Sequence, residues 1–154
     1  MRTLVTLVSL ATALAASAAD VPRPTEYRHW THVKTMVILP GHPLAGAFGG
    51  MHDVYVNDAG LPALRHGGPF ADGTTFVFDL FESSEQDHAF VAGARKVTAV
   101  MVKDRARFPK TGGWGFQAFA PGDGAAVVKD PAGECFGCHQ SREKTDFVFS
   151  HWTD

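Results

Sequence analysis

The fold of this chain is decided by the stretch Thr74–Phe81, which reads TTFVFDLF. Phe76, Phe78 and Leu80 alternate with Val77 and Asp79, so the first three share one face of an extended chain. Alternation in a run rich in aromatic and β-branched residues predicts a β-strand with two different faces. Two runs of similar composition precede this strand, and two follow it.

These four further runs are separated by Gly, Pro, Asn and Asp residues, which favour turns. They are Val33–Leu39, Met51–Asn57, Val97–Lys103 and Trp114–Ala120. Helical patterns are few: a short helix is predicted over Thr25–His32 with Thr25 as N-cap, and a better one over Gly133–Lys144, after Asp130-Pro131. The predicted fold class is α+β and mainly β: an antiparallel five-stranded sheet with short helices and a C-terminal helix.

The N-terminus has the features of a secretory signal peptide over residues 1–19. It combines a basic Arg2, an apolar run from Leu4 to Ala16, and the small residues Ala16-Ser17-Ala18-Ala19. A transmembrane anchor is the alternative, but the run is short, is interrupted by Ser and Thr, and lacks a basic stop-transfer flank. Residues 20–154 then form one domain with room for one modest core.

Charge excludes two kinds of partner. The net charge is −2 with the two signs interspersed along the chain. This pattern gives neither a basic patch for nucleic acid nor a polybasic surface for a membrane. We therefore expect no nucleic-acid or membrane partner.

The only two cysteines stand in the motif Cys135-Phe136-Gly137-Cys138-His139. C-x-x-C-H is the attachment site of a c-type haem, in which two thiols bind the porphyrin edge and the histidine binds the iron. We therefore predict covalently bound haem c on Cys135 and Cys138, with His139 as the metal ligand, so that the C-terminal helix is haem-binding. A disulfide or half of a zinc site is the alternative, but zinc needs two further ligands and no second cluster follows. Covalent haem c is assembled outside the bacterial cytoplasm, which agrees with the signal peptide and predicts a periplasmic protein.

The strand pattern argues against two familiar classes of c-type cytochrome. The small electron-transfer class is helical and carries its motif near the mature N-terminus, whereas here the motif lies near the C-terminus. The four-helix cytochromes c′ place it at the C-terminus, but the glycines and prolines of residues 40–73 forbid their long helices. An antiparallel sheet with a C-terminal haem helix remains.

In six segments, the chain resembles the family of cytochrome P-460 and the cytochromes c′-beta. The segments are Tyr27-Arg28-His29-Trp30, Asp53–Asn57 (DVYVN), Phe70–Thr74 (FADGT), Val100–Asp104 (VMVKD) followed by Arg107-Phe108, Gly112–Phe116 (GGWGF), and Cys135–His139 with Asp146–Phe149 (DFVF). Each is weak alone, but six in order are specific. The resemblance implies an antiparallel sheet with helices packed on it, a homodimer, and a five-coordinate haem held by the C-terminal motif.

The two branches of this family differ in one lysine. In cytochrome P-460 a lysine is cross-linked to the porphyrin and the protein oxidises hydroxylamine, whereas the cytochromes c′-beta lack the cross-link and bind NO and CO in an apolar distal pocket. Counting back from Phe70 places that lysine in Leu64–Gly67, where Arg65 or His66 stands instead. A guanidinium stays protonated and is a poor nucleophile. The resemblance therefore favours the c′-beta branch, and Arg65 becomes a candidate cofactor-binding residue that pairs with a haem propionate, the alternative being a solvated turn residue.

The distal residues favour the same branch. Hydroxylamine oxidation needs a base, which in this family resembles a carboxylate on the strand matching Val97–Lys103, and that strand carries Ala99 and no Asp or Glu. Phe48, Phe76 and Phe78 are the candidate distal residues, although each could instead be ordinary core. An apolar cap suits neutral diatomic gases.

The predicted function is a periplasmic mono-haem cytochrome of the c′-beta type that scavenges or senses NO. Its expected partners are NO and CO, a redox partner protein and a second copy of the chain. The alternatives are a hydroxylamine oxidoreductase and a plain electron carrier with a sixth ligand from Met36, Met51 or Met101. His29 and His32 are expected to be ordinary, because two histidines without a third ligand rarely bind metal. His52, on a predicted strand, is expected to be ordinary too.

Overall fold

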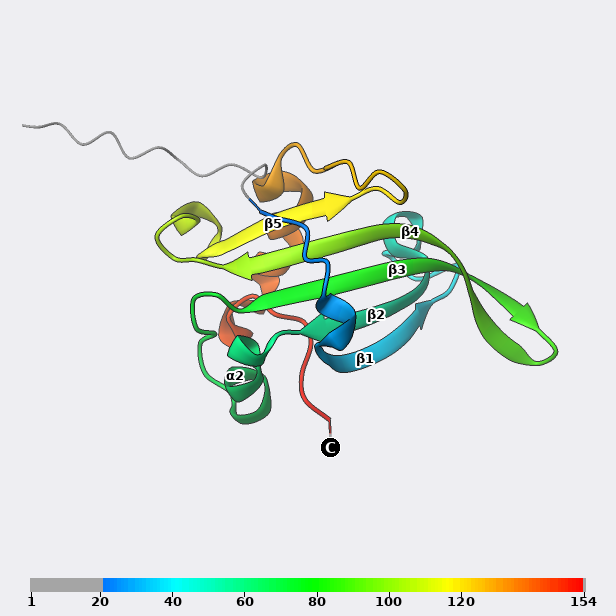
Figure 1. The fold of residues 1–154 in the computed structure, drawn as a ribbon, viewed down its shortest axis with the longest axis horizontal. Coiled ribbons are helices and arrows are strands. Elements are labelled where there is room, and N and C mark those ends of the chain that lie inside the picture. The colour runs from blue at the N-terminus through cyan, green and yellow to red at the C-terminus, as the bar shows by residue number, and fades with distance from the viewer. Residues whose placement is uncertain (1–20, 154) are drawn as a thin grey trace, which may run out of the picture.

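A five-stranded antiparallel sheet is the framework of residues 21–153, the part of the chain that this computed structural model describes (Figure 1). Each strand pairs with its neighbour in sequence, so the order across the sheet is β1-β2-β3-β4-β5. The strands are β1 (Thr31–Ile38), β2 (Gly50–Val56), β3 (Thr75–Gln86), β4 (Ala89–Lys103) and β5 (Trp114–Phe119). The predicted fold class is confirmed, and the five predicted runs are the five strands. The predicted signal peptide lies outside the described residues.

The hairpin of β3 and β4 is longer than the sequence predicts. Its outer part pairs Ser83 with Ala92 and Gln86 with Ala89, and the turn residues Asp87 and His88 both have positive φ, 50° and 63°. Two positive φ values in a two-residue loop are typical of a type I′ hairpin turn. On β3 this part, residues 82–86, is polar and mostly exposed, and on β4 residues 89–94 are all exposed, so neither strand alternates between buried apolar and exposed polar residues. Figure 1 shows this hairpin extending beyond the rest of the sheet.

The two faces of the sheet bury separate cores. One core contains Val54, Val56, Phe76, Met101, Trp114 and Phe116 of the strands, together with Leu64, Phe70 and Val148. The other contains Val77, Val100 and Phe119 of the strands, covered by Val21 and Tyr27 of the N-terminal segment. In Figure 1 this segment, in blue, crosses the near side of the sheet, and the C-terminal helical turns lie on the far side.

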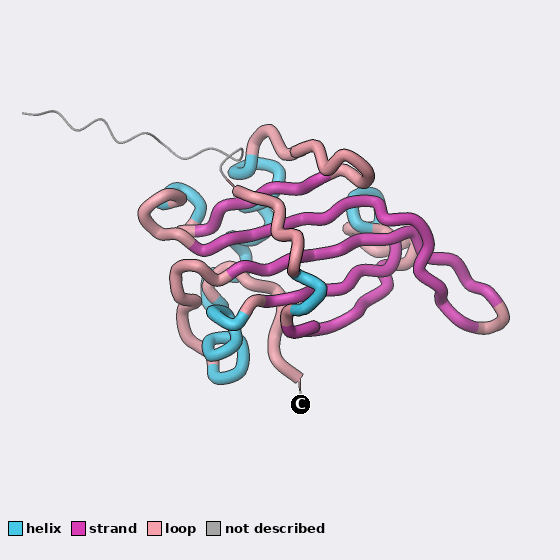
Figure 2. The backbone as a smooth tube through the Cα atoms, viewed as in Figure 1, coloured by secondary structure: helices cyan, strands magenta, loops and turns pink. Residues whose placement is uncertain are grey.

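The helices are short and connect or cover the strands (Figure 2). The α-helices are α1 (Ala45–Phe48), α2 (Leu61–His66) and α3 (Gly137–His139); the 3-10 helices are η2 (Tyr27–His29), η3 (Asp58–Gly60), η4 (Pro109–Thr111) and η6 (Gln140–Thr145); η5 (Ala132–Phe136) is a π-helix. No helix within residues 21–153 is long and apolar enough to cross a membrane.

The predicted helix over Thr25–His32 is reduced to the single turn η2. Its N-cap position is Glu26 rather than Thr25, and Trp30 is already extended, with φ −80° and ψ 171°. The chain turns into β1 here because Tyr27 must reach the buried carboxylate of Asp79, to which its hydroxyl donates at 2.7 Å. Tertiary contact therefore overrides the local helical preference.

Candidate haem-binding site

The C-x-x-C-H motif lies on a helical segment made of η5, α3 and η6. The predicted regular helix over Gly133–Lys144 occupies this place, but it changes from π to α to 3-10 geometry along its length. The Glu134 carboxylate begins it by accepting hydrogen bonds from the amides of Lys129 and Asp130, at 2.8 and 2.6 Å. A first-turn carboxylate that reaches back to amides before its helix is similar to the second half of a capping box and fixes where the chain enters the helix. Short π-helical segments often occur at functional sites.

Both cysteines of the motif are free thiols. Cys135 is half-buried against the sheet core and Cys138 is exposed. Burial raises the pKa of the Cys135 thiol to about 11, so it stays protonated at neutral pH. Within residues 21–153, no three His, Cys, Asp or Glu side chains are grouped as a metal site would require.

The imidazole of His139 is fixed in a form that can bind iron. Its Nδ1 lies 2.7 Å from the carbonyl oxygen of Phe147, which can only accept, so Nδ1 carries the proton. Burial lowers the pKa of His139, which favours the neutral ring and leaves a lone pair on Nε2. The ring packs against Phe116 of β5 and Phe149, with both ring-centre distances 5.0 Å.

A partly open apolar strip runs along the same face of the sheet from Phe116. Ala118 follows on this face of β5, pairs with Ala99 of β4, and Ala99 pairs with Phe78 of β3. All three are half-buried, whereas the flanking residues of the sheet core are buried. Two alanines side by side leave space above the sheet that larger side chains would fill.

The three predicted distal phenylalanines separate into two environments. Phe48 of α1 packs edge-on against Phe78, with ring centres 5.7 Å apart. Phe76 is only 4% exposed and packs between Phe70 and Trp114 in the core. The structure thus brings Phe48 and Phe78 together and places Phe76 in the core beneath the C-terminal segment.

Arg65, the predicted cofactor-binding residue outside the motif, is exposed on α2. Its guanidinium stacks over the ring of Trp152, 4.5 Å from the ring centre. The contact joins α2 to the last residues of the described chain and is a typical cation–π geometry. His66, the other residue at the predicted cross-link position, is exposed.

His52 is far less ordinary than the sequence suggested. It is 2% exposed, lies on the same face of β2 as Val54 and Val56, and stacks on Phe78 with ring centres 4.3 Å apart. Its buried Nδ1 has no hydrogen-bond partner within the described residues. Burial, with a smaller contribution from the charge of Lys34, lowers the pKa of His52 to about 4. A neutral imidazole therefore adjoins the pair of Phe48 and Phe78.

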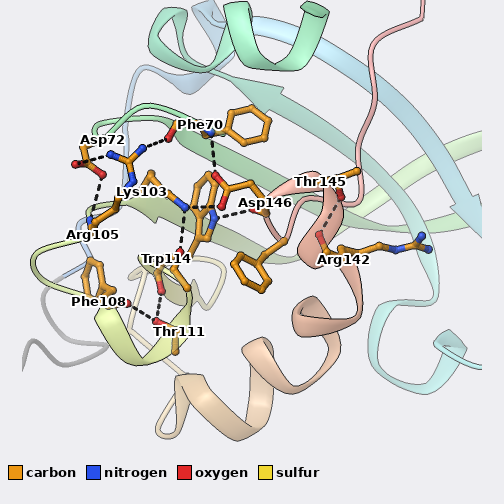
Figure 3. A network of polar contacts seen from close by, with 12 residues as sticks. Phe70, Asp72, Lys103, Arg105, Phe108, Thr111, Trp114, Arg142, Thr145 and Asp146 are labelled. Atoms are coloured by element: carbon orange, nitrogen blue, oxygen red, sulfur yellow. Dashed lines mark hydrogen bonds and ion pairs between the residues drawn. The ribbon is translucent and has the colours of Figure 1, made fainter. Parts of the chain in front are cut away.

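The buried ion pair between Lys103 and Asp146 was also not predicted from the sequence. The Nζ of Lys103 lies 2.6 Å from Oδ1 of Asp146, and only 3% of the lysine side chain is exposed (Figure 3). Lys103 ends β4, and Asp146 follows η6 at the start of the loop that carries Phe147. Both residues belong to segments that carried the family resemblance, which was the available signal.

A helical segment with two free thiols and the neutral His139, packed against a sheet with an apolar strip, is the arrangement of a haem protein. A family model described as cytochrome P460 matches residues 24–150. The chain belongs to the cytochrome P460 family and is a haem-containing cytochrome. A comparison with curated proteins finds no match.

The described residues fit the cofactor that this family implies. His139 offers Nε2 because Nδ1 is already engaged, and Cys135 and Cys138 lie within the same helical segment. The half-buried strip of Phe78, Ala99 and Ala118 offers a flat apolar surface. These residues would hold the porphyrin and its iron.

Proposed function

We propose that this protein is a periplasmic mono-haem c-type cytochrome of the c′-beta branch, which binds NO and CO at a five-coordinate iron. In this proposal the thiols of Cys135 and Cys138 attach the haem covalently, His139 Nε2 is the one protein ligand, and Phe48 and Phe78 form the distal wall. When bound, the haem supplies the iron at which a diatomic ligand is held. His139 would offer its neutral imidazole to the iron, and the apolar wall of Phe48 and Phe78 would exclude water.

One observation carries the proposal: the edge-on pair of Phe48 and Phe78 beside Ala99. Phe78 and Ala99 are directly opposed on β3 and β4, so β4 presents only the methyl side chain of Ala99 beside Phe78. β4 carries no carboxylate anywhere from Ala89 to Lys103. Without a carboxylate on this strand, no strong base is available there for removing protons from hydroxylamine. An apolar wall instead suits neutral gases and offers little to a charged or strongly polar ligand.

His52 adds one polar group behind this wall. Its low pKa keeps it neutral near pH 7, where it is a weak base and carries no charge. The ring stacks on Phe78 and is almost completely buried, so the apolar surface stays continuous. This arrangement supports gas binding more than proton-coupled oxidation.

The testing experiment is the absorption spectrum of the protein purified from the periplasm, oxidised and dithionite-reduced, with and without NO. We expect a ferrous Soret band in the ordinary high-spin range of haem c that changes on adding NO. A strongly red-shifted ferrous band would mean a cross-linked macrocycle, and hydroxylamine turnover would then replace gas binding as the function. A low-spin spectrum in both redox states would mean a sixth ligand and an electron carrier.

Covalent attachment is tested separately on the denatured protein. Haem should remain with the wild-type chain through acid–acetone extraction and be released from a Cys135→Ala/Cys138→Ala variant. Extraction of haem from the wild-type chain would refute attachment through these thiols. A Ser141→Ala variant is the matched control, because Ser141 lies on the same segment and its hydroxyl donates to the backbone carbonyl of Cys138, at 2.8 Å, rather than to either thiol.

We also propose a homodimer that uses the projecting hairpin of β3 and β4. Phe90 and Val91 are 50% and 41% exposed on this hairpin, although both are large apolar residues. Exposed apolar side chains on a projecting element favour association. Light scattering should give twice the chain mass for the wild type and a lower mass for Phe90→Ser/Val91→Ser. A monomeric wild type would refute the dimer.

A further inference from the structure

The loop that follows the haem-binding segment has an unfavourable backbone conformation. Asp146 and Phe147 both lie in the left-handed region, with φ of 50° and 67°, and neither is glycine. Such a conformation costs about 1 to 2 kcal/mol for each residue and persists only where the surroundings hold it. The contacts of Asp146 and Phe147 hold this loop.

Asp146 is held at three of its atoms. Its Oδ1 accepts from Lys103 Nζ at 2.6 Å, its Oδ2 from the Phe70 amide at 2.9 Å, and its backbone carbonyl from Trp114 Nε1 at 2.9 Å. Figure 3 shows these contacts meeting at Asp146 from three different parts of the chain. Lys103 in turn donates to the carbonyl of Gly112 at 3.0 Å. The loop is therefore fixed to the ends of β4 and β5.

Phe147, the next residue, is held with it. Its amide donates to the Arg142 carbonyl at 2.8 Å, and its ring packs against Phe136 with centres 5.2 Å apart. The ring also lies against Gly112, where any Cβ would overlap it. The carbonyl of this well-fixed residue is the one that accepts the Nδ1 proton of His139, at 2.7 Å.

We propose that Lys103 and Asp146 are positioning residues for the axial histidine, because they fix the Phe147 carbonyl at His139 Nδ1. The inference rests on the proposed role of His139 as the iron ligand. A hydrogen bond to the second ring nitrogen orients a ligating imidazole and raises its basicity, and loss of such a partner weakens the metal bond. The ion pair thus acts on the iron through one backbone carbonyl.

A purely stabilising role does not explain the choice of these two residues. A buried ion pair adds little net stability compared with apolar residues of similar size, because both charges lose their hydration. The pair instead specifies one loop conformation, since Asp146 must meet Lys103, Phe70 and Trp114 together. This conformation aims the Phe147 carbonyl at the histidine.

The test uses the haem-loaded protein and two variants, Lys103→Met and Asp146→Asn. Lys103→Met removes the charge and keeps most of the stem, whereas Asn tolerates the left-handed conformation and still accepts from the Phe70 amide. The readouts are the iron–histidine stretching band of the ferrous protein in resonance Raman spectra and the reduction potential. In both variants we expect a lower frequency and a higher potential than in the wild type, because a less basic imidazole donates less charge to ferric iron.

Two controls separate positioning from stability. Asp79→Asn removes a fully buried carboxylate that is paired with Arg95 on the opposite face of the sheet, so it should lower stability and leave the band in place. Lys103→Arg keeps the charge, so its iron–histidine band should lie closer to the wild-type frequency than that of Lys103→Met.

The outcomes distinguish this inference from the proposed function. A wild-type band that neither variant moves, or that Asp79→Asn moves as far, would overturn the positioning role alone. A ferrous wild-type protein with no iron–histidine band would overturn the ligation by His139, and the positioning role with it.

Discussion

The buried imidazole of His52 should make the stability of this protein fall steeply in mild acid. Its pKa is lowered from 6.5 to about 4 in the folded state, so the unfolded chain binds more protons between these two values. Stability from this group is complete above about pH 6.5 and is lost as the pH falls toward 4. With about 1.36 kcal/mol for each pKa unit, the loss at about pH 4.5 is roughly 2.5 kcal/mol.

The assay is urea unfolding of the haem-loaded protein at about pH 7.5 and about pH 4.5, for the wild type and for His52→Leu. The free energy of unfolding of the variant should fall less between the two pH values, by roughly 2.5 kcal/mol. Carboxylates and the other histidines titrate in both proteins, so their contributions cancel in the difference. The charged groups that act on His52 are Lys34 and Asp53, and both remain in the variant.

At about pH 7.5, His52→Leu should be close to the wild type in stability, within about 1.5 kcal/mol, because the volumes are similar and an unpartnered buried nitrogen is removed. Parallel pH dependences in the two proteins would refute the reasoning. That result would mean that the imidazole reaches water or a partner and is protonated normally in the folded state.

Three further outcomes follow from described contacts. Asp79→Asn should lower the free energy of unfolding by about 3 kcal/mol, because four hydrogen bonds converge on a carboxylate with no exposed area; a loss under about 1 kcal/mol in urea would contradict this. Gly112→Ala should cost about 2 kcal/mol in thermal unfolding and lower the iron–histidine frequency, since φ is +64° and the new methyl would push on Phe147; an unshifted band would break that link. Phe78→Leu should speed CO association in flash photolysis relative to wild type, while Phe90→Leu on the projecting hairpin leaves it unchanged; equal rates in all three proteins would exclude Phe78 from the ligand path.

The strands were predictable because their signal is local. Alternation in Thr74–Phe81 places Phe76 and Phe78 on one face, and the structure keeps them there. The outer hairpin was missed because Glu82–Gln86 is polar on both faces, and only backbone pairing holds it. Pairing of exposed polar strands leaves no periodic pattern in the sequence.

The candidate site could be proposed from the sequence only at its motif. Cys135, Cys138 and His139 follow from spacing alone, whereas the partner of His139 is a backbone carbonyl, which no side-chain pattern reveals. Lys103 and Asp146 stand 43 positions apart, so their ion pair depends on how the C-terminal loop docks on β4.

His52 could have been recognised by the alternation that places it with Val54 and Val56. Alternation could not have predicted that Phe76 lies in the core while Phe78 packs against Phe48. Both lie on one face, and what distinguishes them is which segment of the folded chain covers each ring.

The order of the strands predicts that the sheet and the C-terminal segment fold in separate stages. Because every strand pairs with its neighbour along the chain, no connection within the sheet is longer than the 18 residues 57–74 between β2 and β3, which costs less chain entropy than pairing of distant strands and favours rapid assembly for a β protein. The C-terminal segment is different, since Asp146 must find Phe70, 76 positions earlier, and Lys103, 43 positions earlier. We therefore expect the sheet to form first and to serve as the template on which the motif docks. Under the proposed function, in which Cys135 and Cys138 attach the haem, their thiols would then remain accessible for attachment until the last stage of folding.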